Sequence, residues 1–214
     1  EWTLEHLESR SDANGPLLRA VLQTVGVGCL TMLHAADDEA ALRGALRRAA
    51  VADMVILTGG VSAGRRDLVP DCATAEGWRP VFHKVAQKPG KPLFLAERAG
   101  QLLFGLPGNP LAVHVCAHRY VAAAIRRFCG HSGQPAACRG VLAHSLRVDG
   151  DRTLFCVARA EPGSDGWRLT PLRARSSADV LTTTSANALL RVDPGATHAE
   201  NSQVTFEWLA GADR

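Results

Sequence analysis

The side chains best suited to chemistry in this sequence lie in three loops rich in glycine and proline. In chain order these loops are residues 58–67, 88–92 and 106–110. Their glycines let backbone N–H groups come close to a ligand. Lysines, and the N-termini of the helices expected after two of the loops, favour an anion. Together the loops predict an enzyme site for a phosphorylated, anionic ligand.

The first loop ends on a candidate catalytic carboxylate. Asp67 follows Gly59, Gly60 and Ser62, which leave room for a ligand beside the backbone. Two interpretations of Asp67 stay open. Its carboxylate holds Mg²⁺ or orients a bound water, or it caps the helix that follows.

The second loop holds its cations on a stiff backbone. Two prolines and a glycine restrain Lys88 and Lys91, which lowers the cost of gathering like charges around an oxyanion. Lys84 precedes them on an expected strand, where it is either solvated or turned toward the same anion.

The third loop leads into a helix. Gly108 and Asn109 stand just before Pro110, so Asn109 either caps the helix or presents its amide and the free helix N–H groups to a ligand. His114 and His118 then share one helix face. Because no third ligand has a suitable spacing, we expect a packed or exposed pair there and no metal site.

Alternating helices and strands are expected to position these loops. The pattern predicts helices at 14–25, 37–50, 67–76 and 109–128, and strands at 27–33, 54–57, 81–87, 93–97 and 102–105. Residues 54–57 are all apolar, as in a buried parallel strand. We therefore predict an open α/β sheet with helices on both faces, which binds ligands at the carboxyl ends of its strands.

The pattern changes after residue 130. Residues 131–135 read as a linker. Short strand-like runs follow at 139–148, 152–160, 167–171, 189–192 and 203–208. Asp149-Gly150 predicts a hairpin turn, and residues 164–166 predict another. The sequence thus divides into an α/β domain at 1–132 and a small all-β domain at 138–214.

Composition narrows the class of protein. The 214 residues are 46% apolar and 21% charged, as in soluble globular proteins. A net charge of +3, spread over scattered arginines, does not indicate nucleic-acid binding. There is no apolar run of about 20 residues for a membrane helix, and no secretory signal. Six widely spaced cysteines predict reduced thiols in a cytoplasmic protein.

The three loops in this order, with a long helix and a β region containing Ser185-Ala186-Asn187, resemble the MoeA-type molybdopterin molybdotransferases. Gephyrin's E domain belongs to the same family. The resemblance runs from about Asp12 to the C-terminus and covers the family's last two domains. It implies a three-layer, MogA-like molybdopterin-binding domain followed by the β domain. The implied activity is insertion of molybdate into adenylylated molybdopterin, with release of AMP. Mg²⁺ as cofactor and a homodimer are also implied, and a molybdopterin adenylyltransferase is a candidate partner.

The resemblance assigns roles to the charged residues. Asp67 matches the family's essential acidic residue and is also the candidate metal ligand. Lys88 and Lys91 match catalytic positions. With Lys84 and Pro92 they form the implied basic wall around phosphate and molybdate.

Further positions match the family's substrate-binding segments. The resemblance places the following residues at the pterin nucleotide: Gly59, Gly60, Ser62, Gly108 and Asn109. Thr182 stands where the family has a serine and keeps the hydroxyl group.

Two departures bear on catalysis. Ala112 and Val157 stand where the family has a serine and an arginine that help to hold molybdate. Losing an oxyanion-binding donor typically costs a few kcal/mol of transition-state stabilisation. Arg159 or Arg175 is a candidate substitute.

These departures keep rival functions open. The first is a degenerate homologue that binds molybdopterin without inserting metal. The related adenylyltransferase activity is the second, although the β domain and the 88–92 loop argue against it. A scaffold role is the third.

Overall fold

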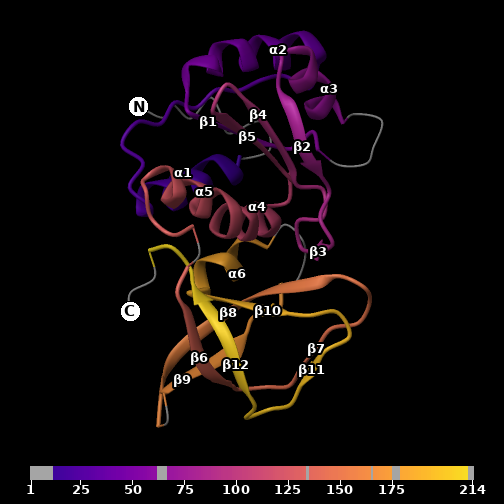
Figure 1. Cartoon of the computed structure of the whole chain (residues 1–214). Coiled ribbons are helices and arrows are strands. Elements are labelled where there is room, and N and C mark those ends of the chain that lie inside the picture. The colour runs from indigo at the N-terminus through magenta and orange to yellow at the C-terminus, as the bar shows by residue number, and fades with distance from the viewer. Residues whose placement is uncertain (1–11, 62–66, 134, 165, 175–178, 212–214) are drawn as a thin grey trace.

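The computed structural model describes residues 12–61, 67–133, 135–164, 166–174 and 179–211. Figure 1 shows a sheet flanked by helices in the first half of the chain and a set of curved strands in the second half. None of the helices in these described ranges is long and apolar enough to cross a membrane.

The first half is built on a four-stranded sheet with the order β1-β5-β4-β2. Strand β1 (Met54–Thr58) pairs in parallel with β5 (Gln101–Leu106). Strand β4 (Phe94–Arg98) is antiparallel to both β5 and β2 (Arg79–His83). Strands β1, β5 and β2 therefore point the same way, and their carboxyl ends meet at one edge of the sheet.

Helices cover both faces of this sheet, as predicted. On one face lie α2 (Glu39–Arg48), the 3₁₀ turn Ala49–Val51 and α3 (Leu68–Ala75), packed against Trp78 and Leu103. The other face carries α1 (Asn14–Thr24), α4 (Pro110–Cys116), the π-helical segment Ala117–Val121 and α5 (Ala122–Phe128). The predicted helix 109–128 is confirmed as α4, the π segment and α5 in succession.

Two details of this half differ from the prediction. Residues 27–33 were expected to form a strand, but the described chain has no strand there. Val27 and Leu30 instead pack their side chains against the core of the second face. Strand β1 was expected to be buried, yet only Val55 is, because β1 lies at the edge of the sheet.

The expected strand 81–87 is interrupted. Strand β2 ends at His83, and Lys84 adopts a left-handed backbone conformation with φ of 71°. The chain resumes as β3 (Gln87–Lys88), which leaves the first sheet and pairs in parallel with β8 of the second half. A non-glycine residue in this conformation turns the chain sharply, and a strand cannot continue through it.

The second half is a small barrel. Its strands are β6 (Ala137–Leu142), β8 (Thr153–Gly163), β9 (Gly166–Pro171), β10 (Ala188–Val192) and β12 (Gln203–Trp208). The order is β10-β12-β6-β9-β8, and β10 also pairs with β8, which closes the ring. Its interior is apolar and includes Leu142, Leu169, Leu190 and Phe206. A separate two-stranded ribbon joins β7 (Leu146–Arg147) to β11 (Thr197–His198).

The barrel confirms the predicted strands, and one predicted turn is wrong. A single short helix, α6 (Val180–Ser185), precedes β10 in this otherwise β region. Asp149-Gly150 does not close a hairpin, since β7 before it pairs with β11, whereas β8 after it pairs with β9 and β10. The predicted turn at 164–166 is confirmed by the β8–β9 hairpin, in which Gly163 lies opposite Gly166.

The two halves meet through an apolar cluster and a backbone seam. Alternate residues of β8 and β10, including Phe155, Val157 and Leu189, face outward and pack with Val115 of α4. The seam is the pairing of β3 with β8. The predicted domain boundary between residues 132 and 138 stays a prediction.

Candidate anion-binding site

Two of the predicted loops touch at the carboxyl edge of the first sheet. The Gly59 N–H donates to the Leu106 carbonyl at 3.0 Å, which joins the end of β1 to the end of β5. Gly59 and Gly60 both have positive φ angles, of 87° and 66°. A Cβ on Gly108 would lie 3.6 Å from the Gly59 Cα. No side chain lies within 4 Å of a Cβ built on Gly59 or Gly108, so the backbone at these two glycines is open to a phosphate.

Helix α1 is fastened to the third loop. Asp12 Oδ1 accepts the N–H groups of Asn14 and Gly15, each at 3.0 Å. Asn14 resembles a helix cap in the sequence, but it is the first residue of α1, and Asp12 accepts the first-turn N–H groups in its place. The Asn14 amide instead donates to the Gly108 carbonyl at 3.0 Å. Helix α2, predicted to begin at residue 37, is capped by Asp38, which accepts a hydrogen bond from the Ala41 N–H.

Asn109 is the cap of α4. Its side-chain oxygen accepts the Leu111 N–H at 3.0 Å, as the capping interpretation expects. This bond fixes the turn between β5 and α4 against the Gly59 turn. A ligand-binding role for Asn109 is a separate prediction.

Asp67 does not act as a helix cap. It immediately precedes α3, but no first-turn N–H donates to its side chain. Its Oδ1 atom is buried and accepts no hydrogen bond from the described residues. Burial raises the pKa of Asp67, and the neighbouring His83 and Lys84 oppose that rise. A buried carboxylate oxygen without a donor is costly and needs an explanation such as a missing ion or ligand.

A divalent cation fits this carboxylate. No three His, Cys, Asp or Glu side chains cluster as a metal cage anywhere in the described chain. Mg²⁺ does not need such a cage, because it is commonly held by one or two carboxylates together with substrate phosphates and water. The unpaired Asp67 Oδ1 meets that requirement on the protein side.

The second loop is held by a buried polar network that the sequence did not reveal. Gln87 is 2% exposed, and its amide donates to the Pro89 carbonyl at 2.9 Å. The Tyr120 hydroxyl donates to the other end of the same side chain. Gly90 has a φ of 94°, and a Cβ there would clash at 2.6 Å with both Cys116 Sγ and Gln87 Nε2. The loop conformation is therefore set from the helical layer beneath it.

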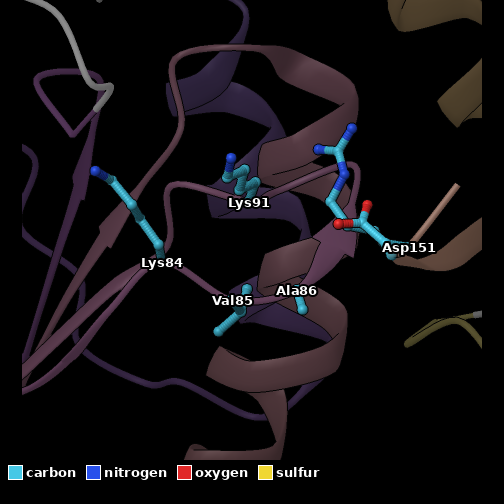
Figure 2. A pocket seen from close by; sticks show the side chains of 6 residues that line it. Lys84, Val85, Ala86, Lys91 and Asp151 are labelled. Carbon is cyan, nitrogen blue, oxygen red and sulfur yellow. The ribbon is translucent and has the colours of Figure 1, made fainter.

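An open cleft of about 480 Å³ brings some of the predicted lysines together. It is lined by Lys84, Val85, Ala86, Lys91, Asp151 and Arg152 (Figure 2). Figure 2 shows Lys84 and Lys91 pointing to the same side of the backbone at Val85 and Ala86. Asp151 and Arg152 come from the barrel and were not singled out from the sequence.

Three predicted site residues lie elsewhere or outside the described chain. Lys88 is exposed in β3 and does not line this cleft. Thr182 donates its hydroxyl to Asp179 Oδ2 at 2.8 Å and belongs to the cap of α6. Ser62 lies outside the described residues, as does Arg175. Pro92 is half-buried in the turn before β4.

The two departures are both buried. Ala112 and Val157 are each 3% exposed. Val157 sits in the apolar cluster between β8 and α4, so an oxyanion cannot reach its side chain. The candidate substitute Arg159 pairs with Glu161, with 3.7 Å between the Arg159 Nε and Glu161 Oε1 atoms.

His114 and His118 form a packed pair. Their ring centroids lie 4.5 Å apart, and both side chains are buried. The Ala210 N–H donates to His118 Nδ1 at 3.0 Å. Burial lowers the pKa of His114 to about 4 and that of His118 to about 3, so both rings are neutral at pH 7.

Comparison with known proteins agrees with this architecture. The family model described as "Probable molybdopterin binding domain" matches residues 5–127. A curated molybdopterin molybdenumtransferase of Staphylococcus epidermidis is 30% identical over 190 residues, which are 87% of this chain and 45% of the relative. One of Staphylococcus aureus is 29% identical over 186 residues, covering 86% of this chain and 44% of the relative. The chain thus spans less than half the length of these relatives.

Solved structures show the same fold. A molybdopterin biosynthesis MoeA protein of Pyrococcus horikoshii superposes with a TM-score of 0.78 at 24% identity, over 92% of this chain and 48% of that one. A molybdenum cofactor biosynthesis protein of Pyrococcus furiosus gives 0.73 at 22% identity, over 92% and 64%. The chain belongs to the molybdopterin-binding domain family, and within it to the MoeA type.

Proposed function

We propose that this chain binds adenylylated molybdopterin at the carboxyl edge of the first sheet and acts in the insertion of molybdate, with release of AMP. Family membership supports a role in molybdenum cofactor biosynthesis. The observation that carries the proposal is Asp67, whose buried Oδ1 lacks a partner among the described residues beside the glycine turn and Lys84.

The loops would divide the work by charge. The backbone at Gly59 and Gly108 would lie close to the pterin nucleotide, because no side chain lies within 4 Å of a Cβ built on either glycine. Lys84 and Lys91 would neutralise the phosphate and molybdate oxygens in the adjoining cleft. Holding these cations in place before the reaction favours a transition state that gathers negative charge.

Asp67 would hold the divalent cation. When bound, Mg²⁺ neutralises negative charge on the phosphates that leave with AMP. Burial raises the pKa of Asp67 because it disfavours the charged carboxylate. A cation bound to the carboxylate would offset that penalty. The charges of His83 and Lys84 act on the same carboxylate and limit that rise.

The test follows AMP release from adenylylated molybdopterin with Mg²⁺, with and without molybdate. We expect molybdate-dependent release that Asp67→Asn lowers by at least ~100-fold, as for removal of a group that stabilises a transition state. Asp53→Asn is the matched control, because Asp53 is exposed just before β1, at the opposite edge of the sheet, and its substitution should leave the rate unchanged. Equal rates for both variants would contradict the role of Asp67.

The second candidate function is binding of molybdopterin without metal insertion. It is favoured by the burial of Ala112 and Val157, which removes two positions that help to hold molybdate in the resembling family. Tight pterin binding with no AMP release under the same conditions would support it. The homodimer and an adenylyltransferase partner belong to the same proposal and are checked by sedimentation and by mixing the purified proteins.

A further inference from the structure

We propose that Arg152 is the oxyanion-binding residue that the barrel contributes to this site, facing Lys84 and Lys91 across the cleft. The inference rests on the proposed function and deepens it: the ligand is a tetrahedral dianion, molybdate or phosphate, held between the two halves of the molecule. The cleft is lined by Lys84 and Lys91 from the first half of the chain and by Asp151 and Arg152 from the segment that enters β8.

The backbone seam fixes Arg152 at the cleft. The Thr153 N–H donates to the Ala86 carbonyl at 3.0 Å, and Gln87 and Lys88 pair with Thr153 and Leu154. Arg152 is therefore the residue before the junction, next to the segment that links Lys84 to Lys91. Backbone pairing holds this position whatever the side chains do, so the guanidinium is presented from a fixed point.

The cations of the cleft are not held in ion pairs by the described residues, although Lys84 and the nearby Asp67 carboxylate attract each other. Lys84, Lys91 and Arg152 make no ion pair with a carboxylate in the described part of the chain. Asp151 also lines the cleft without lying within ion-pairing distance of them. Like charges gathered in one concave place repel each other, and an anion bound among them relieves that repulsion. Of the three, only Arg152 offers a planar fork that can donate two parallel hydrogen bonds to one oxyanion.

The apolar cluster explains why this arginine is needed. Val157, where the family places an arginine, lies five residues further along β8 and faces α4. Arg159 is paired with Glu161. Arg152 at the start of the same segment is half-buried and lines the cleft. The cation from the barrel therefore stands at the seam, not within the interface.

The test measures binding of molybdate and, separately, of inorganic phosphate to the full chain by calorimetry at fixed ionic strength. We expect Arg152→Ala to weaken both anions at least ~10-fold, the size expected for losing a charge-assisted hydrogen bond. Arg152→Lys should recover only part of the affinity, because the charge returns without the fork.

Arg48→Ala is the matched control. Arg48 is exposed at the end of α2, close to the start of β1 and so at the opposite edge of the sheet. The affinity of the Arg48→Ala variant for both anions should equal that of the wild type. Thermal melting of all variants excludes unfolding as the cause of a loss.

The outcomes separate this inference from the proposed function. Unchanged anion affinity in Arg152→Ala, or no anion binding by the wild type, would overturn the role of Arg152 even if AMP is released. Arg152-dependent anion binding without any AMP release would support Arg152 and count against the proposed catalysis.

Discussion

The carboxyl edge of the first sheet and the barrel treat buried polar groups in opposite ways. At the sheet edge, Asp67 Oδ1 and Asn14 Oδ1 are buried without partners among the described residues. In the barrel, Asn187 makes a matched pair of hydrogen bonds with the backbone of Ala160, at 2.7 and 2.9 Å.

This difference indicates that the sheet edge binds a ligand and that the barrel supports it. Buried polar groups without partners are rare in finished interiors and recur where a ligand completes the site. Among the described barrel residues no buried side-chain polar atom lacks a hydrogen-bond partner, and Val157 faces α4 within the apolar cluster. We infer that the barrel braces the sheet edge and contributes chemistry only at the β3–β8 seam.

The largest expected effect comes from forcing the family's residue into the apolar face. Val157→Arg should lower the free energy of unfolding by ~3–5 kcal/mol, because it buries a guanidinium without a partner. Val51→Arg is the control, since Val51 is 94% exposed and should change stability by less than about 0.5 kcal/mol. Urea unfolding measures both. A stable Val157→Arg variant that binds molybdate more tightly would show that this face is a working part of the site.

The buried histidines predict how the interface responds to acid. Folding lowers the pKa of His114 to about 4 and of His118 to about 3. Below an unfolded pKa of about 6.5 the unfolded chain binds protons that the folded chain does not, so stability present at pH 7 is lost as the pH falls toward 4. Each histidine contributes a slope of about 1.4 kcal/mol per pH unit in that window.

Unfolding in urea at pH 7 and pH 5 measures this loss. His118→Gln should flatten the pH dependence, whereas His144→Gln should not, because His144 is exposed. An equally steep dependence in His118→Gln would rule out the buried ring as the source.

A backbone substitution in the 88–92 loop should lower the stability of the protein. Gly90→Ala should cost about 2–3 kcal/mol, since φ is positive and the new Cβ meets Cys116 and Gln87 at 2.6 Å. Gly100→Ala isolates the backbone contribution, because Gly100 also has positive φ but faces open space, and should cost about 1 kcal/mol. Thermal melting compares them. Equal losses would mean that the loop yields to the added methyl group.

The smallest effect should come from Tyr120→Phe. It removes the hydroxyl that donates to Gln87 and leaves the amide oxygen unpaired, at a cost of about 1 kcal/mol. Because Gln87 also holds Pro89, anion affinity in the neighbouring cleft should fall with it. Calorimetry with molybdate checks this. Lost stability with unchanged anion affinity would confine Tyr120 to a structural role.

The sequence predicted the elements whose formation depends on local residue patterns. The apolar run at 54–57 and the helix 109–128 are found, and so is the convergence of the loops at the carboxyl ends of β1 and β5. The run 27–33 has the composition of a strand, yet a strand also needs a partner, which composition does not specify. Asp149-Gly150 has turn chemistry, but strand pairing in the barrel is set by distant segments.

The missed site residues are those joined across long stretches of chain. Gln87 meets Tyr120 from the next helical layer, and Arg152 reaches the cleft only because β3 crosses to β8. A glutamine and an arginine are ordinary surface residues in a sequence. Only the seam, formed by residues more than 60 positions apart, gives them a place at the site.

Amide hydrogen exchange of the full chain, with and without adenylylated molybdopterin and Mg²⁺, tests most directly where the ligand binds. The account predicts slowed exchange at residues 58–61, 84–92 and 106–110 and at the seam around Thr153, with no change at 203–208 in the barrel. Protection confined to the barrel, or none at saturating ligand, would contradict the placement of the site at the sheet edge.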